Sequence, residues 1–523
     1  MSESKNEETQ NLPANTTEKL ANEVEKRAHN RTKRPGNTAF RKYIGEDWGE
    51  RPNGPQRSEV ADFLPARHAK LGRQFIGERL VFPAGDLQVR SNDTDYRFRA
   101  HSAFAHLSGL GQEDEPGSVL VLDPIPNTDG SNDAPTHTAT LYFHPRASRT
   151  SEEFWANSRH GEFWVGARLS AAEMSTLTGL KVAHIDGLRD ALAKDLGARQ
   201  TQLRTIANVD PKIDALVTEI RSQNGILEGA AEADFQLSEA ASELRLIKDA
   251  YEIAEMQKAV NITHAGFTEI LRNLPRAIGH WRGERVVEGA FGAKAREEGN
   301  GLGYETIAAS GNHANTLHWI GNDGPVREGD LILVDAGAEV DSLYTADITR
   351  TLPVNGKFTD TQREIYEAVL EACEAALTKA NESGVRFCEI HSAAMEVIAK
   401  HLENWGILPC TAAESLHPEA QYHRRWMPHG TSHHLGLDVH DCAQAKRELY
   451  DLAQLEPGMI FTIEPGLYFR ADDLKVPERF RGIGVRIEDD ILVTETGAIR
   501  LSEDIPRTVE AVEAWIEQAK ENL

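Results

Sequence analysis

The segment DLILVDAGAEVDSLYTADITRTLPVNGKF, residues 330–358, decides the fold of the second half of this 523-residue chain. Its first part, DLILVDAG, has the pattern of a β-strand and reaches the carboxylate Asp335. Asp347 follows 12 residues later, which leaves room for a strand, a turn and a returning strand. An aspartate before Ala-Gly is most often a turn former. Each of these two residues alone therefore admits a purely structural interpretation.

Further segments of the C-terminal half hold side chains of the same kinds. NTLHW contains His318, and HGTSHHLGLDVH runs from His429 to His440. Two β-branched runs, MIFTIEPGLY and GVRIEDDILVT, contain Glu464 and Glu488. Taken singly, the histidines could form a solvated surface patch, and a glutamate before Pro-Gly could be a turn residue. Glu488 is different, because an unpaired charge inside an apolar strand costs several kcal/mol.

The combination of these segments favours a metal site. Asp335, Asp347, Glu464 and Glu488 stand on separate predicted strands and would repel one another unless a cation joined them. Side chains of neighbouring strands can converge on one face of a sheet. Four oxygen donors and an imidazole suit hard divalent ions such as Mn or Mg, whereas structural zinc sites prefer sulfur and imidazole. Carboxylates that bridge two cations about 3.5–4 Å apart support hydrolysis by a bridging water or hydroxide.

The rest of the chain predicts an α/β (α+β) protein with a tail and two domains. Residues 1–58 are polar and cannot bury enough apolar surface to fold, which predicts a mobile acidic and polar tail. Residues 59–232 contain the strand patterns QFIGERLVFPAG, GSVLVLDP and HTATLYFHP and the helix pattern LSAAEMSTLTGL. They predict a small mixed α/β domain. Within it, DYRFRAHSAFAHLSGL is expected to form a packed surface strand.

Residues 233–523 form the second predicted domain. Apolar residues recur every three or four positions over 235–275, which predicts one long amphipathic helical run. Residues 361–404 are again helical in pattern, and the strands named above surround them.

Composition limits the partners and the location. The formal net charge is -25, and such an acidic surface repels phosphate backbones, so nucleic acid is not expected as a partner. The four cysteines are widely spaced without a CxxC pair, which indicates reduced thiols. The first residues have no apolar core typical of a signal peptide, and no run of 18 apolar residues occurs. We therefore expect a soluble, cytoplasmic protein without membrane contact.

The segments, taken in order, resemble a known family. LHW, VDAGAE, TADITRTLPVNGKF, MPHGTSHHLGLDVHD, TIEPGLY and GIGVRIEDD resemble the motifs of the Xaa-Pro aminopeptidases (aminopeptidase P). That family belongs to the pita-bread metallopeptidases, which include prolidase and methionine aminopeptidase. The resemblance covers approximately residues 60–510. It implies an N-terminal aminopeptidase P-like domain and a pita-bread catalytic domain, in which helices flank a curved antiparallel sheet.

The resemblance also implies roles for individual residues. It implies two divalent metal ions, preferably Mn²⁺, with the ligands Asp335, Asp347, His433, Glu464 and Glu488. The HGTSH spacing selects His433 over His434. The residues implied in catalysis are His318, His429, His440 and Glu464. Tyr468 and Arg486 match positions that line the pocket for the residue after the cleaved bond. Relatives are often dimers or tetramers, so a homo-oligomer is expected.

The implied activity is removal of an N-terminal residue that precedes proline. Proline lacks the amide hydrogen and has a fixed φ, so a peptidase needs a pocket shaped for its ring. Prolidase, which cleaves only Xaa-Pro dipeptides, would share all five ligands and is the nearest alternative. A second alternative is a pita-bread protein without metal, acting as another hydrolase or as a binding module. The five ligand residues argue against it, because such uncompensated charges are costly to keep close together.

Overall fold

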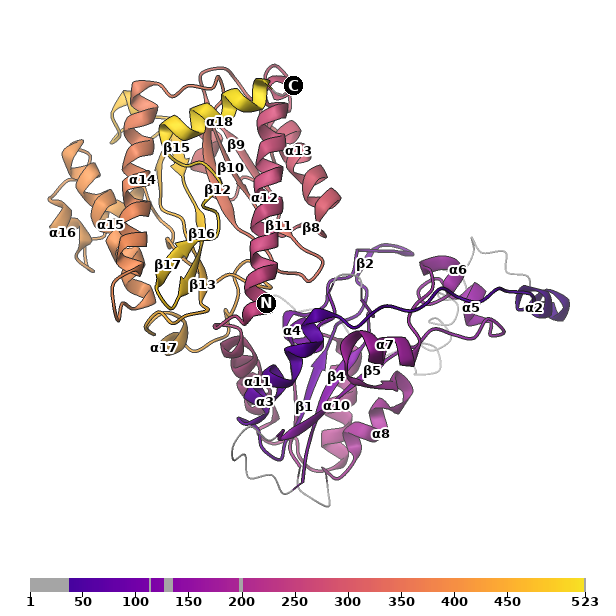
Figure 1. The fold of residues 1–523 in the computed structure, drawn as a ribbon. Coiled ribbons are helices and arrows are strands. Elements are labelled where there is room, and N and C mark those ends of the chain that lie inside the picture. The colour runs from indigo at the N-terminus through magenta and orange to yellow at the C-terminus, as the bar shows by residue number, and fades with distance from the viewer. Residues whose placement is uncertain (1–36, 112–113, 127–134, 197–200, 522–523) are drawn as a thin grey trace, which may run out of the picture.

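The computed structural model describes residues 37–111, 114–126, 135–196 and 201–521. Residues 1–36, most of the predicted tail, lie outside the described residues. Figure 1 shows two bodies of mixed helix and strand, the first formed by the indigo-to-magenta part of the chain and the second by the remainder. This arrangement confirms the predicted fold class. Among the described residues, no helix has both the length and the apolar character needed to cross a membrane.

The first body is built on a five-stranded sheet in the order β6-β5-β4-β1-β7. The patterns predicted as strands form β1, β4 and β5, and the predicted helix forms α7. The strands of this sheet are β1 (Arg79–Pro83), β4 (Val119–Pro124), β5 (His137–Phe143), β6 (Lys181–His184) and β7 (Leu203–Thr205). A separate small hairpin is formed by β2 (Val89–Ser91) and β3 (Thr94–Asp95). The helices are α3 (Leu64–Gly72), α4 (Ser102–Ser108), α5 (Glu153–Ala156), α6 (Glu162–Val165), α7 (Ala171–Thr178), α8 (Leu188–Ala193), α10 (Pro211–Gln223) and α11 (Ala230–Leu244).

The surface strand predicted for residues 95–110 is wrong. The segment contains the helix α4, and every residue of that helix is buried. His101 caps its N-terminus by accepting a hydrogen bond from the Ala103 amide, and Gly109 ends it in the left-handed conformation. A helix buried on all sides has no polar face, so its sequence has no helical period to detect.

Residues 37–58, which the prediction placed in the tail, contact the first body. They include the helix α2 (Thr38–Ile44). Phe40 packs edge-on against Trp155, with 5.1 Å between ring centroids, and Trp48 packs against Phe154 at 5.5 Å. Arg51 forms an ion pair with Glu162, with 2.5 Å between Nη2 and Oε2. Aromatic anchors spaced within a polar sequence hold this segment.

The single helical run predicted over 235–275 is interrupted. It forms α11 and α12 (Ala250–Ala277), separated by residues 245–249. Asp249 caps α12 by accepting from the Glu252 amide at 3.1 Å, and the Glu252 carboxylate accepts from the Asp249 amide at 3.0 Å. This capping box starts a new helix and changes the chain direction.

The second body contains short antiparallel sheets between two layers of helices (Figure 1). Its sheets have the orders β12-β10-β9, β13-β16-β17, β14-β15 and β11-β8. The strands are β8 (Gly301–Leu302), β9 (Ile307–Ser310), β10 (Leu331–Ala336), β11 (Ala338–Glu339), β12 (Ile348–Pro353), β13 (Ile460–Ile463), β14 (Gly466–Phe469), β15 (Ile483–Arg486), β16 (Asp489–Thr494) and β17 (Gly497–Arg500). The helices besides α12 are α13 (Gly283–Glu298), α14 (Asp360–Ala380), α15 (Phe387–Asn404), α16 (Ala412–Leu416), α17 (Arg447–Tyr450) and α18 (Val509–Glu521).

The alternation along β10 separates two hydrophobic cores. Leu331 and Leu333 pack in the core that contains α14 and α15, whereas Ile332 and Val334 pack in the core that contains α12, α13 and α18. A strand whose successive side chains point to opposite faces has this pattern. Because both faces are covered, the end of β10 is held rigidly, and this strand leads to Asp335.

A third hydrophobic core is shared between the two bodies. It contains Phe82 and Phe104 of the first body together with Met256 of α12 and Leu343 of the second. Leu343 is fully buried and has a φ of 73°, which is unusual for a bulky residue. Gly111 allows the contact, because a Cβ atom there would lie 2.2 Å from the Asp341 carbonyl oxygen. The hairpin tip at 340–344 therefore packs into the boundary between the bodies.

Candidate metal centre and substrate cleft

The first two predicted ligands lie on one β-hairpin. Asp335 is near the end of β10 and pairs in register with Thr349 of β12, and Asp347 directly precedes β12. The two arms come very close at Gly337, where a Cβ atom would lie 1.6 Å from the Ala346 carbonyl oxygen. Only glycine fits there. The close approach explains the glycine of the VDAG sequence and brings the two aspartates to one end of the sheet.

Glu464 and Glu488 lie where two strand pairs meet. Ile463 pairs with Asp489 between β13 and β16, and Gly466 pairs with Arg486 between β14 and β15. The two glutamates thus lie between the two ladders, on facing segments. The Glu488 amide donates to the Thr349 carbonyl at 3.1 Å, and the Thr349 hydroxyl donates to Glu488 Oε2 at 2.6 Å. These bonds join the glutamates to the hairpin of the aspartates.

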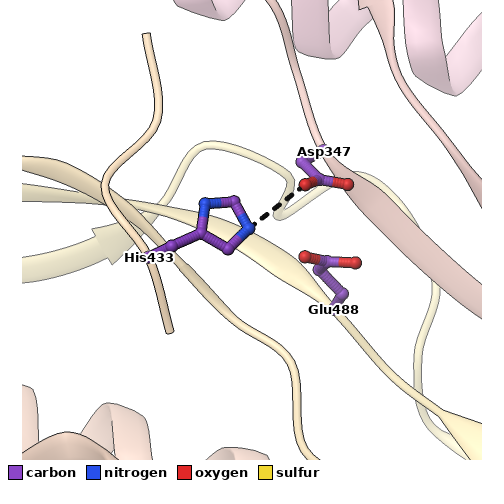
Figure 2. A group of neighbouring side chains, drawn as sticks. All are labelled: Asp347, His433 and Glu488. Carbon is purple, nitrogen blue, oxygen red and sulfur yellow. Dashed lines mark ion pairs between the residues drawn. The ribbon is translucent and has the colours of Figure 1, made fainter. Parts of the chain in front are cut away.

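The side chains of His433, Asp347 and Glu488 meet in the interior of the second body. Each offers a ligand atom, and these atoms all lie within 4.8 Å of one another. Figure 2 shows the imidazole of His433 pointing toward the carboxylates of Asp347 and Glu488. His433 Nε2 lies 3.3 Å from Asp347 Oδ2 and 3.4 Å from Glu464 Oε1. The single Tyr304 hydroxyl lies within hydrogen-bonding distance of both aspartates, 2.7 Å from Asp335 Oδ1 and closer to Asp347 Oδ1.

Burial and mutual repulsion shift the pKa values of the residues in this cluster. Burial raises the pKa of Glu488 well above its usual range, and the charges of Asp347 and Glu464 raise it further. Burial and Asp347 also raise the pKa of Glu464 to about 7, although His433 opposes this shift. Burial would lower the pKa of His433, but its hydrogen bond with Asp347 and the charge of Glu464 raise it to about 9. Like charges that are buried together raise carboxyl pKa values in this way when no cation is present, and the donor set fits a hard divalent ion.

We expect the apparent affinity for Mn²⁺ to rise as the pH increases from 6 to 9. Metal ligands must be deprotonated, so an ion held by the predicted ligands His433 and Glu464 would compete with their protons. Both pKa values are raised, so the competing protons leave as the pH passes about 7 and then about 9. Isothermal titration calorimetry of metal-free protein at several pH values measures the affinity, and changing the buffer measures the protons released. An affinity that is the same at pH 6 and pH 9 would contradict this prediction.

The cluster opens into a cleft of about 510 Å³. The predicted residues His318, His429, His440 and Arg486 line it together with all five predicted ligands. Its walls also include apolar side chains, namely Ile307, Leu317, Ile320 and Val439. A cleft of this size, with apolar walls and polar groups at one end, is typical of a site for a small ligand or a peptide end.

Tyr468 is buried behind the cleft, only 5% exposed. It is joined to the cleft by two hydrogen-bonded neighbours. The Tyr468 hydroxyl lies 2.8 Å from His429 Nε2 and accepts from Arg486 Nη1 at 3.1 Å. Arg486 also donates to Asp335 Oδ2 at 2.5 Å and from Nε to the Thr349 hydroxyl at 3.1 Å. Arg486 therefore links Asp335 of the aspartate hairpin to Tyr468, which in turn contacts His429.

Two of the cleft histidines are neutral at ordinary pH. Burial, supported by the charge of Arg486, lowers the pKa of His429 to about 3. Burial and the charge of His433 lower the pKa of His440. A neutral imidazole has one donor and one acceptor nitrogen, so these residues can both give and receive hydrogen bonds.

Several contacts to the predicted ligands involve residues that the sequence analysis missed. Thr349 lies two residues after Asp347, on the strand β12 that Asp347 directly precedes, and this spacing of two could have placed it on the ligand face. Asp490, fully buried, accepts from the Asp347 amide at 3.2 Å. Tyr304 comes from the segment GLGYET, which has no recognisable motif, so a single sequence gives no signal for it.

Comparisons with known families agree with this geometry. Residues 254–495 match a family described as metallopeptidase family M24. This match implies that the protein binds divalent metal ions. Residues 65–204 match a family described as aminopeptidase P, N-terminal domain.

Individual relatives cover most of the chain. It is 46% identical over 459 residues to Xaa-Pro aminopeptidase 2 of Streptomyces coelicolor, covering 88% of this chain and 92% of that protein. It is 33% identical over 467 residues to the Xaa-Pro aminopeptidase of Escherichia coli, covering 88% and 99%. The low-pH form of aminopeptidase P from E. coli superposes with a TM-score of 0.75 at 30% identity, covering 89% and 100%. A zinc-substituted form of the same enzyme, in complex with product, superposes with a TM-score of 0.74 at 30% identity, covering 89% of this chain and 99% of that chain.

Proposed function

The chain belongs to metallopeptidase family M24, among the Xaa-Pro aminopeptidases, and from this premise we propose how its residues perform the reaction. The enzyme is a metal-dependent exopeptidase that releases an N-terminal residue preceding proline. The observation that supports our assignment of the site is the meeting of His433, Asp347 and Glu488 beside a cleft lined by further histidines.

We assign the metal ligands to Asp335, Asp347, His433, Glu464 and Glu488. Two divalent ions, preferably Mn²⁺, would be held there, because an oxygen-rich set with one imidazole suits manganese. When bound, these ions would polarise the scissile carbonyl and lower the pKa of a water molecule. The hydrogen bonds from Tyr304 and Arg486 fix the orientation of Asp335, and that from Thr349 fixes Glu488. Partners of this kind hold ligands in place before binding.

The remaining groups handle the peptide and its protons. Glu464 lies 3.4 Å from His433 Nε2 and lines the cleft, where it can accept a proton from the attacking water. His318, His429 and His440 line the same cleft and would donate hydrogen bonds to the peptide carbonyl oxygens. One of these imidazoles then passes a proton to the leaving proline nitrogen.

Selection of proline requires a surface that accepts its ring without an amide hydrogen bond. Arg486 lines the cleft, and Tyr468 supports Arg486 and His429 from behind. In our assignment these two residues shape the pocket for the residue after the cleaved bond. Tyr468 acts there through its two hydrogen-bonded neighbours, because its own side chain is buried.

We expect His440→Ala to lower kcat while the metal content stays near that of the wild type. His440 lines the cleft but is not among the assigned ligands. Loss of a general acid–base group reduces turnover by about 100 to 10,000-fold. Metal analysis of the purified variant measures the content, and steady-state hydrolysis measures kcat. A loss of metal in proportion to activity would place His440 in the ligand set instead.

The location, oligomeric state and partners of the enzyme follow from its composition and its relatives. We propose a cytoplasmic enzyme that acts as a homo-oligomer, a dimer or tetramer, on peptides with proline at the second position. The net charge of -25 disfavours nucleic acid as a partner and gives no reason to expect a membrane surface.

The test is hydrolysis of Arg-Pro-Pro and of Arg-Pro by metal-stripped protein, before and after Mn²⁺ is added. Release of arginine from the tripeptide only in the presence of metal is the expected result. Cleavage of the dipeptide alone would make the enzyme a prolidase. Hydrolysis of neither peptide, with Mn²⁺ bound, would contradict the proposed function.

A further inference from the structure

Two segments of the second body supply four of the assigned site residues, and they touch each other. The first is the hairpin that contains Asp335 and Asp347. The second, which we call the histidine loop, is residues 433–440 and contains His433 and His440. The Thr345 amide of the hairpin donates to the Gly436 carbonyl of the histidine loop at 2.9 Å. The relative position of these segments decides whether the imidazoles and carboxylates meet.

Arg99, which belongs to the first body, contacts both segments. Its Nε donates to Glu339 Oε2 on the hairpin at 2.6 Å. Its Nη2 donates to the Leu437 carbonyl of the histidine loop, and its Nη1 lies 3.5 Å from Asp438 Oδ1. Three nitrogen atoms of one guanidinium group thus join two segments that are separated by almost 100 residues in the sequence.

The anchor points of Arg99 are themselves fixed. Glu339 is buried, accepts a second hydrogen bond from Asn300 Nδ2 at 2.6 Å, and bridges to Thr345 across the hairpin. Thr345 stands two residues before Asp347. On the other segment, Ser102 donates to Asp438 Oδ1 at 2.5 Å, and Asp438 stands two residues before His440. A shift at either anchor would therefore move a residue of the cleft.

We infer that Arg99 is a positioning residue of the peptidase, through which the N-terminal body holds the aspartate hairpin and the histidine loop in the arrangement that the metal centre needs. The inference rests on the proposed assignment of the site residues. Arg99 is not among the residues that line the cleft, so it acts through the two segments and not on the peptide.

The contacts of Arg99 indicate that it positions the two segments and does not only stabilise the fold. Its side chain is 37% exposed, whereas that of its partner Glu339 is only 6% exposed, so solvent screens the pair on the arginine side alone. The geometry of the fork is more important than its charge, because a guanidinium group can bond two partners in a fixed plane and an ammonium group cannot. The loss of Arg99 should therefore disturb the site more than the fold.

The test compares Arg99→Ala with Arg159→Ala in the full-length protein. Arg159 is a matched control, because its side chain is 39% exposed and pairs at 2.8 Å with Asp95 inside the first body. For Arg99→Ala we expect kcat to fall and the Kd for Mn²⁺ to rise by about 10-fold or more, as for groups that orient metal ligands. KM should change little, and the control should match the wild type in all three quantities. All assays are made well below the melting temperature of each variant, so that a loss of stability, such as that from leaving the buried Glu339 unpaired, is kept apart from the effect on the site.

Arg99→Lys is the second variant and keeps the positive charge. It should retain a low kcat and a weakened Mn²⁺ affinity, because one ammonium group cannot bond Glu339 and Leu437 together. If Arg99→Ala does not fold, Arg99→Lys provides the same comparison. Wild-type kcat and Mn²⁺ affinity in the folded Arg99 variants, or equal losses in Arg159→Ala, would overturn the inference. An inactive wild-type enzyme would contradict the proposed function instead, and this outcome is distinguishable because the wild type is measured first.

Discussion

Replacing Asp347 with alanine is expected to abolish peptide hydrolysis and to reduce the bound metal. Asp347 is 5% exposed, and its Oδ2 lies 3.3 Å from His433 Nε2. Removing it takes away a carboxylate that the assigned site needs to balance a divalent ion. Groups outside the ligand set already cost about 10 to 100-fold when they are lost, so the loss of a ligand should exceed 100-fold. Metal analysis by mass spectrometry and hydrolysis of Arg-Pro-Pro measure the two effects.

Asp341→Ala is a matched control for this variant. Asp341 lies six residues earlier on the same hairpin and is exposed, and its backbone carbonyl is the group that approaches Gly111. We expect normal metal content and activity in this control. Full activity of Asp347→Ala at wild-type metal content would refute the assignment of the ligand.

Replacing Asp489 with alanine is expected to destabilise the second body by about 3–5 kcal/mol, as when one partner of a buried ion pair is removed. Asp489 accepts from Arg350 Nη2 at 2.7 Å, from Arg507 Nη1 at 3.0 Å and from the Ser502 hydroxyl at 2.6 Å. Arg350 is completely buried, so the variant leaves its guanidinium group without a carboxylate. Urea unfolding at neutral pH, followed by tryptophan fluorescence, measures the change in the free energy of unfolding.

The sign of the pH dependence follows from the pKa of Asp489. Burial would raise this pKa, but Arg350 and Arg507 hold it well below its ordinary value. A depressed carboxyl pKa contributes stability that is complete above the unfolded value, about 4, and is lost as the pH falls. The difference between variant and wild type should therefore be largest at neutral pH. The control Lys357→Ala removes a 73% exposed partner of Glu513 and should cost at most about 1 kcal/mol. Equal stabilities of Asp489→Ala and the control would contradict the prediction.

The sequence predicted the sheet elements well, because their patterns are local. Strands such as β10 have apolar runs that end at a carboxylate, and both their start and their end are visible in the sequence. The break before α12 was missed although Asp249 and Glu252 form a capping box. Apolar residues keep recurring every three or four positions across the break. This pattern therefore predicted one continuous helix in spite of the capping box. Helix α4 was missed for the opposite reason, because complete burial removes the period.

The site residues could be grouped from sequence only because each stands in a recognisable segment. Proximity of Asp347, His433 and Glu488 depends on contacts between distant segments, such as the bond from the Glu488 amide to Thr349. Tyr304 contributes a single hydroxyl, and nothing in its neighbours in the sequence distinguishes it from any buried tyrosine. Arg99 was equally invisible, since its partners lie more than 200 residues away.

The hydrophobic core that both bodies share has a consequence for modularity. Phe104, Met256, Leu343 and Leu437 belong to one cluster, so a fragment of residues 233–523 would expose a large apolar face where the first body packs. Such a fragment would aggregate. A hybrid enzyme with the N-terminal half of another protein would need apolar side chains that pack against Leu343 as those of the first body do. A recombination point between the two halves would therefore have to preserve both sides of this contact.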